Sequence, residues 1–192
     1  MDDWYTPESL APEAETSTKK SSSLLKEIIQ VVLLVVLVRV GMDTFLPRYV
    51  VEGASMEPNF HTSERVIVDR VSMLVSGPER GDVVVLDSPA SDELLIKRVI
   101  GLPNETVVIR NGRVYVNDKL LNEPYVLNYC TSRSCDGMWH LGPDEYFVLG
   151  DNRSSSLDSH VFGPVHRSAI KGIARVLYWP PKDIKLVGDP SY

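Results

Sequence analysis

The sequence predicts a mostly β protein, with a folded antiparallel sheet or barrel-like domain behind a single N-terminal transmembrane helix. One long apolar run, residues 28–38, lies near the N-terminus. The chain has 13 proline and 12 glycine residues, many in short turn-like clusters between β-branched runs, which favours strands over helices. No long amphipathic helical pattern follows the apolar run.

The length and the net charge limit the number of domains and the kinds of partner that the chain can have. Its 192 residues leave room for one domain of ordinary size after a tail and an anchor. The net charge is −6, whereas nucleic-acid binders usually carry a basic patch or stripe. We therefore expect no nucleic-acid partner.

Residues 1–23 are polar and acidic, and because they cannot bury a core we expect them to form a disordered tail. Lys19, Lys20 and Lys26 precede the apolar run. Positive charge on this flank places the tail in the cytoplasm.

Residues 24–46 are long enough to cross a bilayer, since a span needs about 20 residues. Arg39 and Asp43 are four residues apart and can pair on a helix. The alternative is a cleaved secretory signal, but no small-x-small site closely follows Val38. We expect an uncleaved, single-pass anchor in the cell membrane, with residues 47–192 on the extracytoplasmic face.

Several runs after the anchor are typical of short strands. Residues 107–116 are the clearest, since Asn111-Gly112 between two β-rich runs predicts a type I′ hairpin. The other predicted strands are residues 65–70, 82–86, 94–100, 145–149 and 173–178.

Ser55 is the candidate nucleophile. Gly53 and Ala54 before it are small enough to let the backbone approach a substrate closely, and Pro58 fixes the turn that follows. Taken alone, a serine near a glycine is more often an ordinary loop residue, because its hydroxyl is inert unless a base takes its proton. The residues that follow supply a base.

Lys97 is the candidate base. On a strand it shares one face with Leu95 and Val99, both apolar. A lysine acts as a base only when it is neutral; its ordinary pKa is about 10.4, and burial can lower it to about 5–6. The alternative is an edge-strand lysine that keeps the protein soluble.

A polar turn, residues 150–153, follows the apolar strand at 145–149. Beyond it, Ser156 and Asp158 are two residues apart and so face the same side of an extended chain. A hydroxyl there would hold the lysine amine in line with the serine, and the carboxylate would fix the local geometry. The alternative is an ordinary polar loop.

A histidine base is the rival chemistry. His160 lies close to Asp158, but the chain lacks the G-x-S-x-G turn that presents a serine to such a base.

Cys130 and Cys135 lie in one short loop. Outside the cytoplasm they would pair as a disulfide. Their spacing to His140 also suggests zinc, but three ligands without an obvious fourth make a weak signal. Free thiols are the third alternative.

Five segments, in this order behind one anchor, resemble bacterial type I signal peptidases, the Ser-Lys proteases that remove signal peptides. They are Ser55-Met56-x-Pro58, residues 65–69, residues 81–83, residues 97–103 and residues 150–159. The resemblance covers about residues 20–180.

This resemblance implies a role for each site residue. Ser55 would be the nucleophile, with its own backbone N–H as an oxyanion donor, and Lys97 the general base. Ser156 would orient the lysine, and Asp158 with Arg153 would support the site.

Three positions depart from the family pattern. Gly53 stands where some members carry a serine that acts as a second oxyanion donor. Asn59 replaces the usual threonine, and His160 replaces a frequent arginine. The family also carries a short extra subregion, which here would include residues 117–143 with both cysteines.

The activity implied is a membrane-anchored endopeptidase that cuts exported preproteins after small-x-small sites. The substrate would lie extended along a strand edge, with Met56 and Pro58 among the residues that bind it. Neither a metal nor an organic cofactor is required. Two alternatives remain: a repressor-type Ser-Lys protease that cleaves itself, and a non-catalytic membrane-tethered β module.

Overall fold

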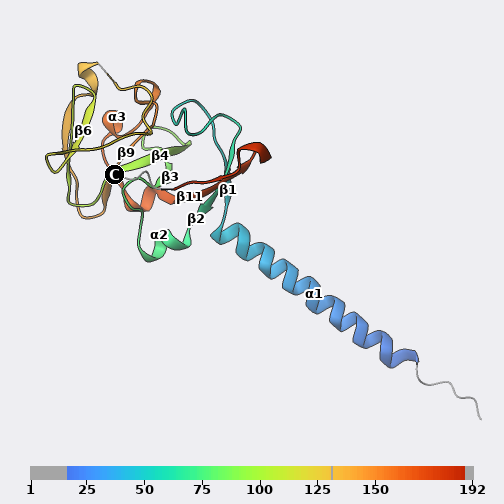
Figure 1. Ribbon diagram of the computed structural model, residues 1–192. Coiled ribbons are helices and arrows are strands. Elements are labelled where there is room, and N and C mark those ends of the chain that lie inside the picture. The colour runs from blue at the N-terminus through green and yellow to red at the C-terminus, as the bar shows by residue number, and fades with distance from the viewer. Residues whose placement is uncertain (1–16, 131, 189–192) are drawn as a thin grey trace, which may run out of the picture. The chain divides into compact units, whose positions relative to one another are not determined.

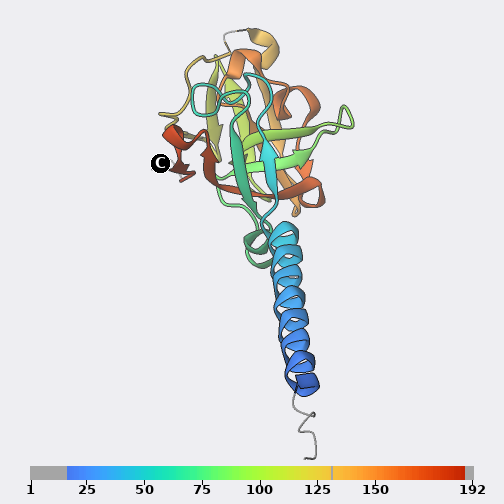
Figure 2. The same ribbon diagram turned by 90° about the vertical axis from the view of Figure 1, so that its right-hand side faces the viewer.

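The computed structural model describes residues 17–130 and 132–188. By its internal contacts the chain divides into residues 1–41 and residues 42–192. Figures 1 and 2 show a long N-terminal helix and a β-rich unit.

Helix α1 (Ser17–Phe45) contains the predicted anchor. Within it, Leu24–Phe45 is long and apolar enough to cross a membrane, with a mean hydropathy of 2.1. The helix begins at Ser17, within the stretch of residues 1–23 that we expect to form a tail; residues 1–16 lie outside the described residues. The helix extends this far because no proline or glycine interrupts residues 17–40.

The larger sheet of the folded unit contains eight antiparallel strands. Seven follow the order β1-β2-β11-β3-β4-β9-β10, and β12 pairs with β11. The bounds are β1 (Arg48–Val50), β2 (Arg65–Asp69), β3 (Val83–Asp87), β4 (Leu94–Gly101), β9 (Glu145–Leu149), β10 (Val165–His166), β11 (Ile170–Trp179) and β12 (Lys185–Leu186).

The smaller sheet has the order β7-β6-β5-β8. Its strands are β5 (Thr106–Arg110), β6 (Arg113–Val116), β7 (Lys119–Leu120) and β8 (Gly137–His140). Strands β5 and β6 form the predicted hairpin, in which Asn111 (φ 51°) and Gly112 (φ 72°) both have the positive φ that a type I′ turn requires.

Beyond the anchor, the described α-helices are short: α2 (Val71–Val75) and α3 (Ser159–Phe162). Four 3₁₀ turns accompany them, η1 (Arg133–Cys135), η2 (Arg153–Ser155), η3 (Arg167–Ala169) and η4 (Pro181–Asp183). The mostly β fold class is therefore confirmed, and every strand predicted from the sequence is present. The strands that sequence patterns missed, such as β7 and β10, have two to four residues, too few to show a period.

Strand β3 lies at the centre of the core and is buried on both faces. Val83 and Val85 pack into one apolar cluster, and Val84 and Leu86 pack into another. A third cluster joins the two sheets, with Ile100 and Phe147 from the larger sheet and Val107 and Val114 from the smaller one. Because β4 pairs with the buried strand β3, residues on β4 also lie in the protein interior.

Candidate active site

Ser55 lies in the loop that follows β1. Gly53 has a φ of +79°, a conformation that favours glycine, so its role here is to turn the chain. The amides of Asn59 and Phe60 each donate to the Met56 carbonyl at 3.0 Å and close the loop. The Ser55 side chain is left partly exposed at the surface of a cavity.

Lys97 is buried on β4, with 2% of its surface exposed. Its Nζ donates to Ser55 Oγ at 2.8 Å and to the Ile96 carbonyl at 2.9 Å. Burial lowers the pKa of Lys97 from the usual 10.5 to about 8, although Asp158 and Asp151 pull it upward. The predicted serine and lysine are thus brought together, and the amine is neutral in a substantial fraction of molecules near pH 8.

The turn after β9 holds the backbone of the loop that carries Ser55. The amide of Asn152 donates to the Ser55 carbonyl at 3.0 Å, and Asn152 Nδ2 donates to the Ala54 carbonyl at 3.2 Å. A Cβ at Gly150 would lie 2.5 Å from the Ser55 carbonyl oxygen, so glycine permits this close approach. Asn152 is a positioning residue that sequence patterns missed.

Ser156 does not form the expected hydrogen bond with the lysine. Its Oγ is buried and has no hydrogen-bond partner within the described part of the chain. The expected Ser156–Lys97 hydrogen bond is therefore absent from this structure, because the lysine amine is directed at Ser55 and the Ile96 carbonyl instead.

Asp158 is fully buried and holds the turn together. One carboxylate oxygen accepts from the Gly150 amide at 2.9 Å, and the other lies 2.7 Å from His160 Nδ1. His160, which stands in place of the family's frequent arginine, therefore still contacts this aspartate. The histidine contacts Asp158, whereas the hydrogen-bond partner of Ser55 Oγ is Lys97.

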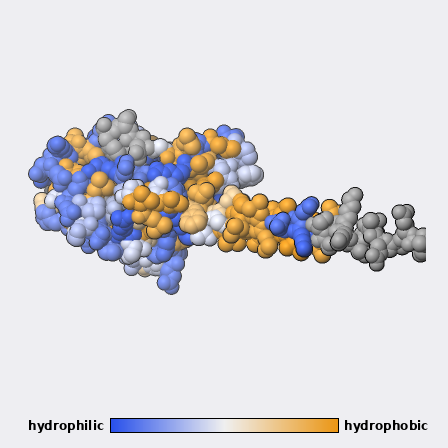
Figure 3. Space-filling view, turned by 90° about the horizontal axis from the view of Figure 1, so that it is seen from below, coloured by the Kyte–Doolittle hydropathy of each residue, from blue (hydrophilic) through white to orange (hydrophobic). Residues whose placement is uncertain are grey.

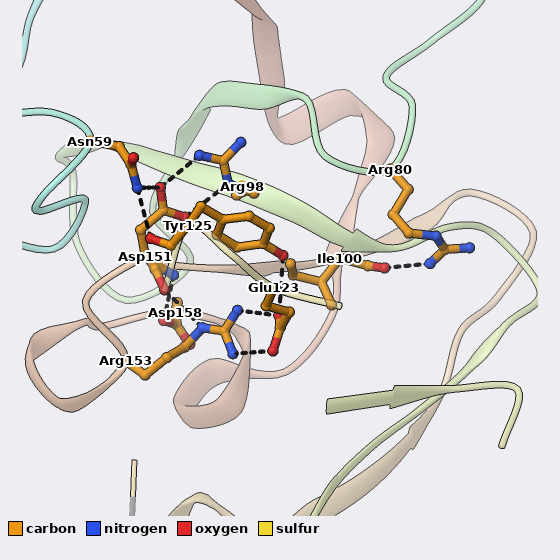
Figure 4. A network of polar contacts seen from close by, with 10 residues as sticks. Asn59, Arg80, Arg98, Ile100, Glu123, Tyr125, Asp151, Arg153 and Asp158 are labelled. Atoms are coloured by element: carbon orange, nitrogen blue, oxygen red, sulfur yellow. Dashed lines mark hydrogen bonds and ion pairs between the residues drawn. The ribbon is translucent and has the colours of Figure 1, made fainter. Parts of the chain in front are cut away.

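Arg153 contacts a carboxylate that the sequence analysis did not single out. Its guanidinium forms a buried ion pair with Glu123, and its Nε donates to the Gly150 carbonyl at 3.0 Å. Burial lowers the pKa of Arg153, but the charge and hydrogen bond of Glu123, together with the charges of Tyr125 and Asp158, outweigh it and hold the pKa above its ordinary value. Figure 4 shows this pair beside Asp158.

A second buried pair lies next to it. Arg98 donates to both carboxylate oxygens of Asp151, at 2.9 and 2.6 Å, and its guanidinium lies 4.3 Å from the centre of the Tyr125 ring. Asn59 Nδ2 donates to Asp151 and to the Tyr125 carbonyl, each at 2.8 Å. These contacts, drawn in Figure 4, join the loop after β1, β4 and the turn after β9. Neither Arg98 nor Glu123 was singled out from the sequence.

A cavity of about 680 Å³ opens at the serine and lysine. Strand β9 pairs with β4 only from Arg98 onward, so within the described structure residues 94–97 have no strand partner on that edge. The lining residues are Tyr49, Val50, Val51, Glu52, Gly53, Ala54, Ser55, Val66, Val85, Asp92, Glu93, Leu94, Leu95, Ile96, Lys97, Ser155 and Leu157.

Met56 and Pro58 are absent from this lining, contrary to the expectation that they bind substrate. Met56 is 1% exposed and packs in the core with Val83 and Val85, whereas Pro58 is exposed outside the cavity. The loop turns Met56 inward, so its apolar surface stabilises the fold.

Cys130 and Cys135 form a disulfide, with their Cα atoms 6.2 Å apart. His140 is the third residue of the zinc hypothesis. Its Nδ1 atom lies 3.0 Å from Thr106 Oγ1. With both sulfur atoms joined, the zinc and free-thiol alternatives do not describe this structure.

A partly exposed serine that is hydrogen-bonded to a buried lysine, beside an open strand edge, has the chemistry of a serine hydrolase acting on an extended chain. Comparison with known proteins agrees. The sequence model of the family described as "Signal peptidase, peptidase S26" matches residues 21–179.

Two relatives are similar over nearly their whole length. A signal peptidase I of Leptolyngbya laminosa is 36% identical over 200 residues, covering 96% of this chain and 95% of the relative. A signal peptidase I of Bacillus amyloliquefaciens is 38% identical over 184 residues, covering 90% and 97%. A crystal structure of a signal peptidase I from Enterococcus faecalis V583 covers 50% of this chain and 95% of that chain, at 33% identity and a TM-score of 0.45.

The chain belongs to the signal peptidase family, peptidase S26. It is therefore an enzyme, a serine peptidase that hydrolyses peptide bonds. The family is membrane-anchored, and helix α1 fits such an anchor. The resemblance found in the five segments is confirmed, and the match favours the signal peptidase hypothesis over the repressor-type protease.

Proposed function

We propose that the protein removes N-terminal signal peptides from exported preproteins, with Ser55 as nucleophile and Lys97 as general base. The observation that carries the proposal is the 2.8 Å hydrogen bond between Lys97 Nζ and Ser55 Oγ, made by a lysine that is almost fully buried. A buried amine loses its proton at a lower pH than an exposed one, and the neutral amine can accept the serine proton.

The reaction then proceeds in two halves. Ser55 Oγ attacks the scissile carbonyl while its proton passes to Lys97 Nζ, and the same proton then goes to the leaving amine as the C–N bond breaks. Lys97, neutral again, takes a proton from a water molecule that attacks the acyl-serine, and the serine recovers its proton as the ester breaks. The backbone N–H of Ser55 is the oxyanion donor that we propose.

The preprotein would bind as an added strand along the open edge of β4 at residues 94–97. Alternate residues of a strand face the same side, so the residues one and three positions before the cut would face the enzyme. Val51, Val85 and Ile96 line the cavity and leave an apolar surface for small side chains. We therefore propose cleavage after small-x-small sites.

For the topology, we propose a cytoplasmic N-terminus, one crossing of the bilayer by α1, and a catalytic unit on the extracytoplasmic face, where preproteins emerge. Lys19, Lys20 and Lys26 support this orientation by the excess of positive charge on the cytoplasmic side of membrane helices. The disulfide between Cys130 and Cys135 fits an oxidising compartment.

The test is cleavage of a preprotein with an Ala-x-Ala site by the purified full-length enzyme. Ser55→Ala and Lys97→Ala should each lower kcat/KM by at least about 10³-fold, and the double variant should be little worse, because members of a catalytic unit are not additive. Ser134→Ala and Lys171→Ala, both outside the cavity, are matched controls that should cut normally.

Near-native cleavage by Lys97→Ala would exclude the lysine as base, and cleavage by both variants would place the catalytic groups elsewhere in the protein. A preprotein with tryptophan one or three positions before the cut should resist cleavage, whereas tryptophan at the second position should be accepted. Efficient cutting with tryptophan directly before the scissile bond would contradict the small-pocket proposal.

A further inference from the structure

The point at which a bound substrate strand must leave β4 is set by β9. Leu149, the last residue of β9, lies opposite Arg98, so β9 occupies the edge of β4 from Arg98 onward. In the proposed function, the residues before the cut pair with the same edge at residues 94–97. A chain that continued along β4 beyond Lys97 would collide with β9. The residues after the cut must therefore turn away from the sheet at this point.

The turn after β9 forms the wall of the cavity at this end. A Cβ at Gly150, which directly follows β9, would lie 2.3 Å from Ser156 Oγ and 2.5 Å from the Ser55 carbonyl oxygen. The chain at Ser156 thus lies against the loop that carries Ser55. On either side of it, Ser155 and Leu157 line the cavity. The first residues after the cut therefore pass over this turn.

Leu157 is the apolar side chain that the turn presents to the cavity. The backbone is extended at Ser156 (φ −134°, ψ 128°) and at Asp158 (φ −151°, ψ −165°), so successive side chains point to opposite sides. Ser156 Oγ and Asp158 are buried, whereas Leu157 is 45% exposed. Exposed apolar side chains are common on proteins, and Figure 3 shows several on the surface of the folded unit. What distinguishes Leu157 is its place in the cavity wall, at the end where the cut chain leaves.

We propose that Leu157 contacts the side chain of the second residue after the cut and favours an apolar residue there. This inference rests on the proposed function, in which the residues one and three positions before the cut face the enzyme. Because side chains alternate along an extended chain, the first residue after the cut faces away and the second faces the enzyme again. Leu157 is thus a specificity-determining residue for the released chain.

The preference follows from the surroundings of this contact. An apolar substrate side chain removes water from the exposed surface of Leu157, which is favourable. A carboxylate would lose part of its hydration there, and neither Ser155 nor Leu157 supplies a charge or an N–H donor from its side chain in return. A fully enclosed apolar pocket discriminates about 10- to 200-fold per methylene. For a half-open contact we expect a smaller ratio, about fivefold in kcat/KM for leucine over aspartate.

The first test uses the full-length enzyme and preproteins with Leu, Ala or Asp at the second position after the cut. The native enzyme should favour Leu over Asp, Leu157→Ala should reduce the ratio to within about twofold, and Leu157→Lys should favour Asp. Leu120→Lys is the matched control and should keep the native preference, since Leu120 is 59% exposed on β7 and lies outside the cavity lining. The same preference in the native enzyme and both Leu157 variants would overturn the inference.

The second test measures the path of the bound chain without catalysis. Full-length Ser55→Ala protein is mixed with a preprotein that carries a photo-crosslinking leucine analogue at the second position after the cut, and mass spectrometry locates the crosslink. Crosslinks to residues 155–157 are expected. Crosslinks to residues 92–95, at the other end of the cavity, or none in the cavity, would overturn the inference. Failure of the proposed function would show differently, as loss of Ser55-dependent cleavage by the native enzyme.

Discussion

Lys97 and Arg98 are neighbours on β4, and both are buried, with 2% and 4% of their surface exposed. Because successive residues point to opposite faces of a strand, the two cations meet different surroundings. Arg98 lies against the Asp151 carboxylate with two charge-assisted hydrogen bonds. Lys97 donates to uncharged groups, the Ser55 hydroxyl and the Ile96 carbonyl.

The difference shows how neighbouring buried cations on one strand can have different roles: Arg98 stabilises the fold, and Lys97 is the base that we propose. A buried charge with a carboxylate in contact keeps its proton and stabilises the fold. Desolvation lowers the pKa of the lysine to about 8, although Asp158 and Asp151 oppose this from a greater distance. Burial without a directly bonded carboxylate therefore gives Lys97 a lowered pKa that suits the base role that we propose for it.

Arg98→Met removes the cation of the Arg98–Asp151 ion pair and so tests its contribution to stability. The substitution leaves the Asp151 carboxylate buried without its cation, so we expect a loss of about 3–5 kcal/mol in the free energy of unfolding. Chemical denaturation in detergent micelles measures it. The double variant Arg98→Met with Asp151→Leu should regain much of the loss; full stability of the single variant would mean that the pair contributes little.

Removing the charge of Lys97 should change the free energy of unfolding in the opposite direction. The lowering of the pKa of Lys97 from 10.5 to about 8 corresponds to about 3 kcal/mol of destabilisation when the lysine is protonated in the fold. Lys97→Met should therefore raise the free energy of unfolding by up to about 3 kcal/mol at pH 7 while abolishing cleavage.

The stability difference between Lys97→Met and the native protein should change with pH in one direction. Between pH 8 and 10.5 the unfolded lysine holds a proton that the folded one has lost, so the native protein gains stability as pH rises. The advantage of Lys97→Met should shrink across this window. A Lys97→Met protein less stable than the native one at pH 7 would contradict a desolvated lysine.

A smaller effect on stability is expected from loss of the disulfide, which is not part of β4. The loop between Cys130 and Cys135 is short, so removing the bond by a Cys130→Ser, Cys135→Ser double variant should cost about 2 kcal/mol. Cleavage of a preprotein should stay within about twofold of native, since neither cysteine lines the cavity. A large loss of activity at unchanged stability would show that this loop acts directly on the site.

Local patterns were enough to predict much of the fold. The hairpin at Asn111-Gly112 followed from turn chemistry, and β3 followed from an uninterrupted apolar run that is buried on both faces. Ser55 and Lys97 were found because a loop serine and a strand lysine occur in a recognisable order of segments. Their contact at 2.8 Å depends on the sheet pairing, which a single sequence does not specify.

The supporting residues were harder to predict, because their partners are distant in the chain. Arg153 was expected to support the site, but its partner Glu123, 30 residues earlier in a segment without regular structure, was not predicted. Ser156 was expected to hold the lysine, yet among the described residues its hydroxyl has no hydrogen-bond partner. Met56 follows Ser55 and was expected to bind substrate, but the loop geometry turns it into the core.

The most direct test of the account is the pH dependence of kcat/KM for preprotein cleavage. If Lys97 must be neutral to act, kcat/KM should rise about tenfold per pH unit below pH 8 and level off above it. A rate that keeps climbing until pH 10 or beyond would mean that the lysine keeps its ordinary pKa, and it would contradict catalysis by a buried, neutral lysine.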